Sequence, residues 1–136
     1  MKKLLLISIT LFAFQFFAFG QCETEPTVEK TGKTLTQKTV NLDFRSLVSL
    51  RVEANAAETS WAKKGAESNT LTVFVDGKYN QDILLFAGAE KFVYQILLGE
   101  LKAGKHKIVL AANKDHSVNS NSKVFSAIPQ VYSLLS

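Results

Sequence analysis

The chain contains few of the residues from which enzyme active sites and metal centres are usually built. Its 136 residues include one cysteine, two histidines and one tryptophan. Because Cys22 is the single cysteine, no disulfide can form within the chain, and its stability must come from apolar burial. A zinc site needs three or four Cys, His or carboxylate ligands at workable spacing, which this composition does not provide. We therefore expect neither a disulfide framework nor a zinc centre.

The sequence also lacks the motifs of hydrolases and nucleotide-binding enzymes. A hydrolase nucleophile needs a histidine within hydrogen-bond reach. His106 is flanked by lysines at the start of a predicted strand, and His116 lies in a polar loop without a Gly-x-Ser-x-Gly elbow. We interpret both as solvated or turn-capping side chains. The seven glycines are dispersed between predicted strands and form no phosphate-binding loop.

The acidic residues do not indicate a catalytic or metal-binding carboxylate site either. The 12 acidic residues single out no facing pair of the kind that glycoside hydrolysis requires. Calcium is a closer alternative, since Asp76, Asn80 and Asp82 supply oxygen atoms around one hairpin. However, Asp76-Gly77 is the ordinary pair of a tight turn, and Lys78 stands where a further ligand would help. We therefore predict that the chain is not an enzyme and that it needs no metal or cofactor.

Positive charge is too dispersed to indicate a nucleic acid partner. The chain has 16 basic and 12 acidic residues. Lys2 and Lys3 belong to a predicted export signal, so 14 basic residues and a net charge of +2 remain without them. These residues stand in turns or alternate with apolar ones. Binding to a phosphate backbone requires a concentrated positive surface, so we expect no nucleic acid ligand.

The first twenty residues have the layout of a secretory signal peptide. Lys2 and Lys3 precede an apolar run over residues 4–19, and Ala18-Phe19-Gly20 closes the segment. A charged end, a short apolar segment and small residues at the −3 and −1 positions are what an export peptidase requires. We expect cleavage after Gly20, so that residues 1–20 are removed and the protein works in the periplasm, at the cell surface or outside the cell.

Two alternatives to a cleaved leader are open. The first is a retained membrane anchor, but the apolar run is shorter than the roughly 20 residues of a spanning helix, and Gln15 interrupts it. The second is a lipoprotein with lipid on Cys22, although Gln21 stands where such sites carry Gly, Ala or Ser. We favour cleavage and expect no stable membrane span in the mature chain.

The rest of the chain is predicted to form a short lead-in and one all-β domain. Residues 21–33 are polar and show neither the helical nor the strand period, which indicates a flexible segment. The following residues, 34–136, alternate between apolar strands and turns. The predicted strands lie around residues 35–42, 48–52, 71–75, 79–86, 92–98, 104–112 and 124–135. Asp-Gly between two of them predicts a tight hairpin, and only residues 54–66 could carry a short helix.

This spacing predicts an antiparallel β-sandwich of about seven or eight strands. Residues 83–86 and 92–98 are apolar on both faces of their strands. Either these strands are covered on both sides, or their second face meets a ligand or a partner. The apolar residues 128–135 near the end of the chain must likewise dock on the sandwich or on another molecule.

Aromatic side chains provide the positive signal for binding. Trp61 stands in a polar loop, Phe74 lies on an otherwise polar strand face, and Tyr79 follows the Asp-Gly turn. Such rings can stack on a sugar or a peptide, while Asn80 and Gln81 provide polar contacts. The alternative interpretation is structural: Trp61 covers the end of the sandwich, Tyr79 packs beside its hairpin and Phe74 belongs to the core.

One stretch is similar to known secreted modules. Residues 72–110 contain Val-Asp-Gly at the end of one strand, a second strand, and Leu-Gly-x-Leu-x-x-Gly-x-His leading into a third. With these turns the stretch resembles the accessory β-sandwich domains of secreted bacterial proteins, either jelly-roll carbohydrate-binding-like modules or immunoglobulin-like ones. The resemblance implies a binding or spacer role.

Two main hypotheses follow from the sequence. The first is a secreted, non-enzymatic β-sandwich that binds a carbohydrate or another extracellular ligand through a sheet face or its loops. The second is a structural or protein-interaction module, an accessory domain or fragment of a larger secreted protein, in which the apolar C-terminal segment or an exposed strand edge pairs with another chain. A hydrolase is the third and least favoured hypothesis.

Overall fold

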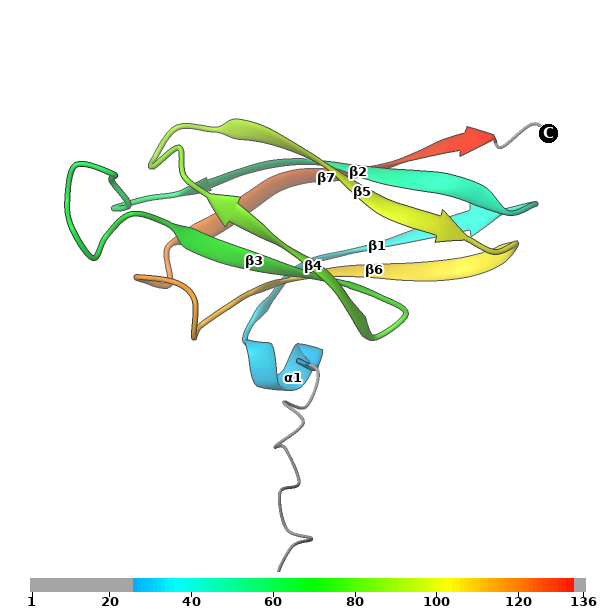
Figure 1. Ribbon diagram of the computed structural model, residues 1–136, viewed down its shortest axis with the longest axis horizontal. Helices are drawn as coiled ribbons and strands as arrows, with labels where there is room; N and C mark the ends of the chain where they lie inside the picture. Colours follow the sequence, from blue (N-terminus) through cyan, green and yellow to red (C-terminus); the bar gives the residue numbers. More distant parts are fainter. Residues whose placement is uncertain (1–25, 134–136) are drawn as a thin grey trace, which may run out of the picture.

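The computed structural model describes residues 26–133, which form two antiparallel β-sheets packed face to face (Figure 1). The predicted signal peptide, Cys22 and residues 134–136 lie outside this part of the chain. A short helix, α1 (Val28–Thr31), comes first. The strands that follow it are β1 (Thr34–Leu42), β2 (Ser46–Ala56), β3 (Asn69–Val75), β4 (Lys78–Leu85), β5 (Phe92–Leu101), β6 (Gly104–Ala112) and β7 (Ser122–Ser133). The prediction of an all-β fold of about seven strands is confirmed.

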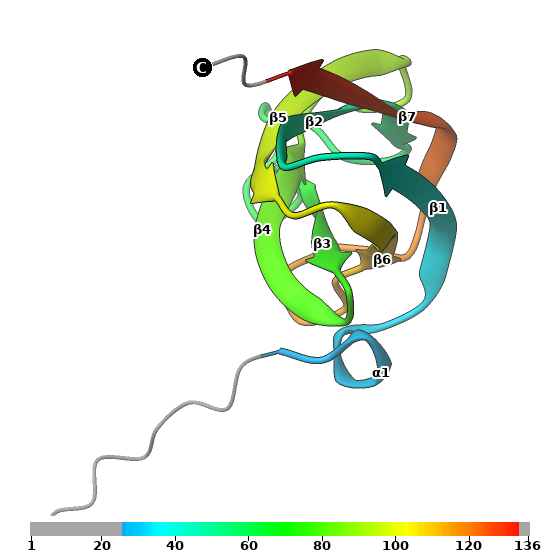
Figure 2. The ribbon, with the colours of Figure 1, turned by 90° about the vertical axis from the view of Figure 1, so that its right-hand side faces the viewer.

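The two sheets have the strand orders β1-β6-β3-β4 and β5-β2-β7. Figure 2 shows them as two layers, with β4 and β5 at one side of the sandwich and β1 at the other. The predicted hairpin joins β3 to β4, and Asp76 and Gly77 at its tip have φ values of 53° and 81°. These are the positive dihedral angles for which the Asp-Gly pair is selected.

Period-two alternation in the sequence explains the core between the sheets. In β2, every second residue from Val48 to Ala56 is fully buried, while Arg51, Glu53 and Asn55 point away from the core. The fully buried aliphatic side chains of the two sheets include Val48, Leu50, Val52, Leu71, Val73, Leu85, Ile108 and Leu110. Each contributes on the order of 1.5–3 kcal/mol by leaving water. Apolar burial therefore stabilises this domain, as the sequence indicates.

The four-stranded sheet also has a second apolar cluster, on its outer face. Phe74, Val109 and Ala111 form it, and Val28 of α1 packs against them. The helix lies within residues 21–33, the segment for which the sequence predicts a flexible lead-in. Helix period is not visible in so short an element, and tertiary contacts hold it in place. Gly32 permits the close approach, because a Cβ atom there would lie 2.2 Å from the carbonyl oxygen of Ala112.

Two further expectations are decided by the structure. The helix considered for residues 54–66 does not form, since β2 continues to Ala56 and turns follow it. Residues 128–133 of the apolar C-terminal segment dock on the sandwich as part of β7, which pairs with β2 through to Ser133. Pro129 is tolerated within β7 because this strand is at the edge of its sheet. Residues 26–133 include no helix with the length and apolar character needed to cross a membrane.

Replacing a central core side chain tests this packing. Leu50→Ala should lower the free energy of unfolding by about 2–5 kcal/mol, because it leaves a cavity between the sheets. Leu84→Ala is the matched control, since Leu84 is 47% exposed. Its effect should stay below about 1 kcal/mol. Urea denaturation of both variants measures the difference, and equal losses would contradict the core described above.

Candidate functional site

The aromatic residues that the sequence predicts to bind a ligand lie in different parts of the structure. Trp61 lies in the loop between β2 and β3 and is 64% exposed. Tyr79 is 40% exposed and lies near the opposite end of β3, where it pairs with Phe74. Phe74 has no exposed surface and belongs to the cluster beneath α1. The expectation of an exposed Phe74 ring is therefore corrected, because α1 covers the face that the sequence left open.

Asn80 and Gln81 connect the edge strands of the two sheets. Asn80 is the extra residue of a bulge in β4, and Leu98 is the extra residue of a bulge in β5. The Asn80 Nδ2 group donates to the Leu98 carbonyl at 3.0 Å, and the Gln81 Nε2 group donates to the Leu97 carbonyl at 2.6 Å. These amides satisfy carbonyl groups that β-sheet pairing leaves free, so the structure assigns them a role in closing the sandwich.

A cleft of about 410 Å³ lies between α1, β4 and the loop after β6. Lys30, Tyr79, Asp82 and His116 are among the residues that line it. Burial and the Asp82 carboxylate raise the pKa of Tyr79 above its ordinary value of 10.0, so the phenol stays protonated. No group of three or more His, Cys, Asp or Glu side chains within residues 26–133 could hold a metal ion.

The floor of this cleft is a hydrogen-bonded network within the protein. Thr72 Oγ1 donates to Asp82 Oδ1 at 2.6 Å and accepts from Asn113 Nδ2 at 3.0 Å. The Asn113 side-chain oxygen accepts from the backbone amides of Asp115 and His116. Because these polar groups satisfy one another, the network holds the loop after β6 against β3.

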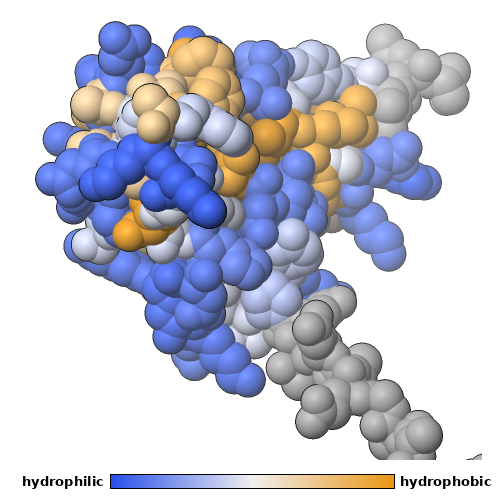
Figure 3. All heavy atoms as spheres, turned by 60° about the vertical axis from the view of Figure 1, so that its left-hand side comes forward, coloured by the Kyte–Doolittle hydropathy of each residue, from blue (hydrophilic) through white to orange (hydrophobic). Residues whose placement is uncertain are grey.

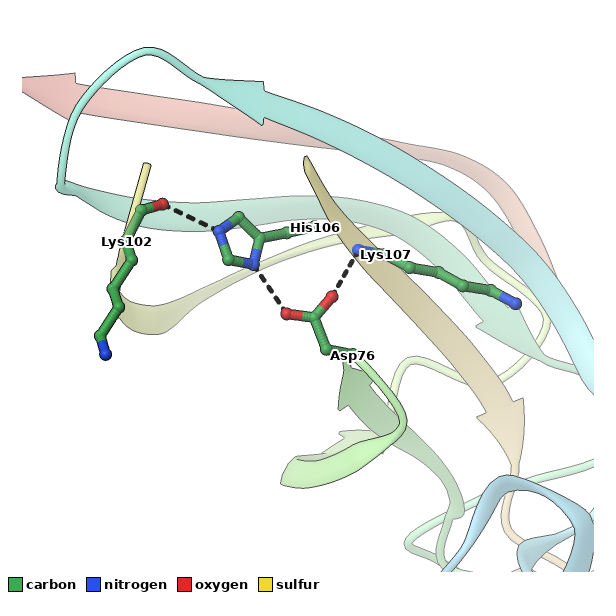
Figure 4. A network of polar contacts seen from close by, with 4 residues as sticks. All are labelled: Asp76, Lys102, His106 and Lys107. Carbon is green, nitrogen blue, oxygen red and sulfur yellow. Dashed lines mark hydrogen bonds and ion pairs between the residues drawn. The ribbon is translucent and has the colours of Figure 1, made fainter. Parts of the chain in front are cut away.

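His106 lies in a second polar network, at the tip of the β3–β4 hairpin (Figure 4). Its Nδ1 atom is 2.7 Å from Asp76 Oδ2, and its Nε2 atom is 2.9 Å from the Lys102 carbonyl oxygen. The other Asp76 oxygen accepts from the Lys107 amide at 2.8 Å. Both nitrogen atoms of the ring thus face acceptors, which favours the doubly protonated imidazolium. The structure agrees with the interpretation of His106 as a turn-capping side chain.

The protonation equilibria of this pair follow from the geometry. The hydrogen bonds to Asp76 and to the Lys102 carbonyl raise the pKa of His106 above 6.5. Partial desolvation opposes the ionisation of Asp76, but hydrogen bonds from Lys107 and His106 outweigh it and bring the pKa below 3.8. Each partner therefore favours the charged form of the other.

A different surface, the outer face of the three-stranded sheet, gathers polar and apolar side chains suited to binding. Residues paired directly across a sheet share a face, so the register defines this surface. Ser49 pairs with Leu97 and Gln130, and Arg51 pairs with Gln95 and Ile128. The face is formed by Leu47, Ser49 and Arg51 of β2, Gln95 and Leu97 of β5, and Ile128, Gln130 and Tyr132 of β7. Figures 1 and 2 show that no element of residues 26–133 covers it, and α1 lies on the opposite side of the sandwich.

Hydrogen bonds arrange the polar side chains of this outer face around one amide. Gln130 Oε1 accepts from Ser49 Oγ at 3.3 Å, from Gln95 Nε2 at 3.2 Å and from Tyr132 OH at 3.4 Å. A groove of about 360 Å³ lies beside this cluster and is lined by Leu47, Ser49, Gln95, Ile96, Leu97 and Tyr132. Apolar side chains of the face remain open to solvent, with exposed fractions of 55% for Leu97 and 45% for Tyr132.

An apolar band runs along the side of the sandwich on which β4 and β5 lie. Figure 3 shows it beginning at the loop end of the domain and continuing along that side. Phe86 and Phe92 lie on this side, where both are partly exposed and their ring centroids are 5.0 Å apart.

Comparison with known proteins does not assign a family. No family model matches the chain, and no curated protein matches it. Among solved structures, the sugar-binding protein described as "EclA C-terminal domain" is similar, with a TM-score of 0.48 and 12% sequence identity. The similarity covers 74% of this chain and 69% of that chain. A likeness at this level does not identify a ligand for this chain.

The bulge contact of Asn80 leads to a stability prediction. Asn80→Ala should lower the free energy of unfolding by about 1 kcal/mol, because the Leu98 carbonyl loses its donor. Lys78→Ala on the same strand is the control, as Lys78 is exposed, and should unfold like the unaltered protein. Urea denaturation measures both variants. Unchanged stability of Asn80→Ala would show that this amide does not hold the two edges together.

The His106–Asp76 pair predicts a pH dependence of stability. A raised His106 pKa stabilises the fold below pH 6.5, and this contribution is lost as the pH rises through the raised value. A lowered Asp76 pKa stabilises the fold above pH 3.8, and this contribution is lost as the pH falls through the lowered value. The stability difference between the unaltered protein and His106→Gln should therefore be largest between these limits. A difference that grows from pH 6 to pH 9 would contradict this assignment.

Proposed function

We propose that this protein is an exported, non-enzymatic binding module that binds carbohydrate through the outer face of its three-stranded sheet. The observation that carries the proposal is the uncovered face itself, which combines clustered amide and hydroxyl groups with exposed apolar side chains. The described part of the sandwich leaves this face free, whereas α1 occupies the corresponding face of the other sheet.

The chemistry of the face matches that of a sugar. A sugar ring presents apolar C–H surfaces together with hydroxyl groups that both donate and accept hydrogen bonds. Tyr132, Leu97 and Ile128 offer apolar contact area, with exposed fractions of 45%, 55% and 50%. Gln95, Gln130 and other polar groups in the same cluster offer donors and acceptors. A few placed polar groups among apolar ones are what ligand sites generally contain.

The backbone supports this use of the face. The side chains of this face come from three paired strands. The central ones project from β2, which is hydrogen-bonded to β5 on one side and to β7 on the other. Hydrogen bonds to Gln130 already orient Ser49, Gln95 and Tyr132. Side chains that are ordered before binding lose less conformational entropy when a ligand arrives, which favours affinity.

Trp61 and Tyr79 lie outside this face, and each is a separate candidate for ligand contact. The exposed Trp61 ring belongs to the β2–β3 loop, and Tyr79 lines the cleft beside α1. Neither ring belongs to the outer face that the register defines. Variants of Tyr132, Trp61 and Tyr79 therefore distinguish a site on the sheet face from one in the loop or in the cleft.

Glycan-array binding followed by titration calorimetry tests the proposal. Tyr132→Ala and Gln130→Ala should each weaken binding by about tenfold, since they remove a central apolar contact or the shared acceptor. Trp61→Ala and Tyr79→Ala serve as matched aromatic controls and should change affinity less than about twofold. Loss confined to Trp61→Ala would place the site in the loop. Absence of binding to every glycan would refute carbohydrate recognition.

The apolar band favours a protein-interaction module as the second candidate function. Phe86 and Phe92 are each 42% exposed at the β4–β5 side, where two edge strands lie close together. Exposed apolar surface and free strand edges are features of interfaces. Size-exclusion chromatography with light scattering separates this candidate from the first. A monomer at every concentration, with no change on Phe92→Ser, would count against self-association through the band.

A further inference from the structure

Arg51 is a cation at the centre of the outer face of the three-stranded sheet. It belongs to β2, the middle strand, and pairs with Gln95 on one side and Ile128 on the other. Its half-buried side chain makes no ion pair with any residue between 26 and 133. Both of its cross-strand partners are neutral, so the guanidinium group lacks a paired counter-ion within this part of the protein.

The nearest carboxylates of the same sheet have partners of their own. Glu53 lies two positions along β2 from Arg51, and Lys91 pairs with it at 3.8 Å. Glu100 on β5 pairs with Arg45. Because each of these acidic groups is matched by another cation, the charge of Arg51 is left in excess on this face.

An arginine in such a position is suited to an anionic group on the ligand. Its planar guanidinium group can donate two parallel hydrogen bonds to a carboxylate or a sulfate, and such charge-assisted bonds are stronger than those between neutral groups. Gln95 stands directly beside Arg51 and also lines the groove next to Ser49. If one sugar unit of a glycan lay over Arg51, the next unit would therefore lie in the groove, and the glycan would run along β2.

We propose that the ligand of this face is an acidic glycan whose carboxylate or sulfate group binds Arg51. The inference rests on the proposed carbohydrate-binding function and specifies its substrate class. A neutral glycan would leave the guanidinium group without a partner while covering it, and loss of its water contacts would oppose binding.

Matched pairs of polysaccharides test the inference by affinity electrophoresis of the full chain. Polygalacturonate is compared with its fully methyl-esterified form, which removes the carboxylate charge. The sulfated galactan carrageenan is compared with neutral agarose. At least one acidic member should bind about tenfold more tightly than its neutral counterpart, in line with the strength of a charge-assisted hydrogen bond. The pair that shows the preference identifies carboxylate or sulfate as the recognised group.

Arginine variants locate the recognition. Arg51→Gln should weaken binding of the acidic member about tenfold and so abolish the preference for it, and Arg51→Lys should retain part of the preference. Lys38→Gln is the control for net charge, because it removes one exposed cation from the other sheet. This control should keep the full preference. An equal loss in Lys38→Gln and Arg51→Gln would show non-specific electrostatic attraction and overturn the assignment.

The remaining outcomes separate the two levels of the proposal. Equal or tighter binding of the neutral members overturns the acidic ligand and leaves carbohydrate binding in place. Absence of binding to all four polysaccharides and to the glycan array refutes the proposed function together with the inference. Self-association that Arg51→Gln alters would instead identify a second copy of the chain as the occupant of this face.

Discussion

Burial of β3 on both of its faces is the constraint on which the rest of the structure depends. One face of this strand contributes Leu71 and Val73 to the core between the sheets. The other face contributes Phe74, which packs beneath α1, and Thr72, which is hydrogen-bonded to Asp82 and Asn113. A strand buried on both sides requires a cover on each, and the second cover is built from α1 and the loop after β6.

This arrangement determines which surface is left for a ligand. The outer face of the four-stranded sheet is largely taken up by its own helix and loop, so its polar groups satisfy one another. The outer face of the three-stranded sheet has no such cover within residues 26–133, and Leu97, Ile128 and Tyr132 remain exposed there. The two sheets thus differ in the outer surface that they expose because they differ in what covers them.

Closure of the sandwich depends on side chains rather than on a continuous sheet. The edge strands β4 and β5 belong to different sheets, and no backbone ladder joins them. Opposed bulges bring Asn80 within reach of the Leu98 carbonyl, and His106 links the hairpin tip to the carbonyl of Lys102. Polar residues that resemble ligand contacts in the sequence therefore serve to join elements, because free carbonyl groups at strand edges must find donors.

Local patterning by itself determined the all-β fold, the approximate position of each strand and the Asp-Gly hairpin. The reason is physical: period-two alternation and turn residues act within a few residues of the chain. Only the tertiary structure decided that Phe74 is buried, that α1 forms and that Asn80 and Gln81 bridge two strands. Thr70, Thr72 and Phe74 share one face of β3, and this face is polar except for the Phe74 ring. The sequence pattern does not reveal which element packs over it. The surface formed by Arg51, Gln95 and Gln130 likewise exists only once β2, β5 and β7 pair in register, because these residues are distant in sequence and share a face through sheet pairing.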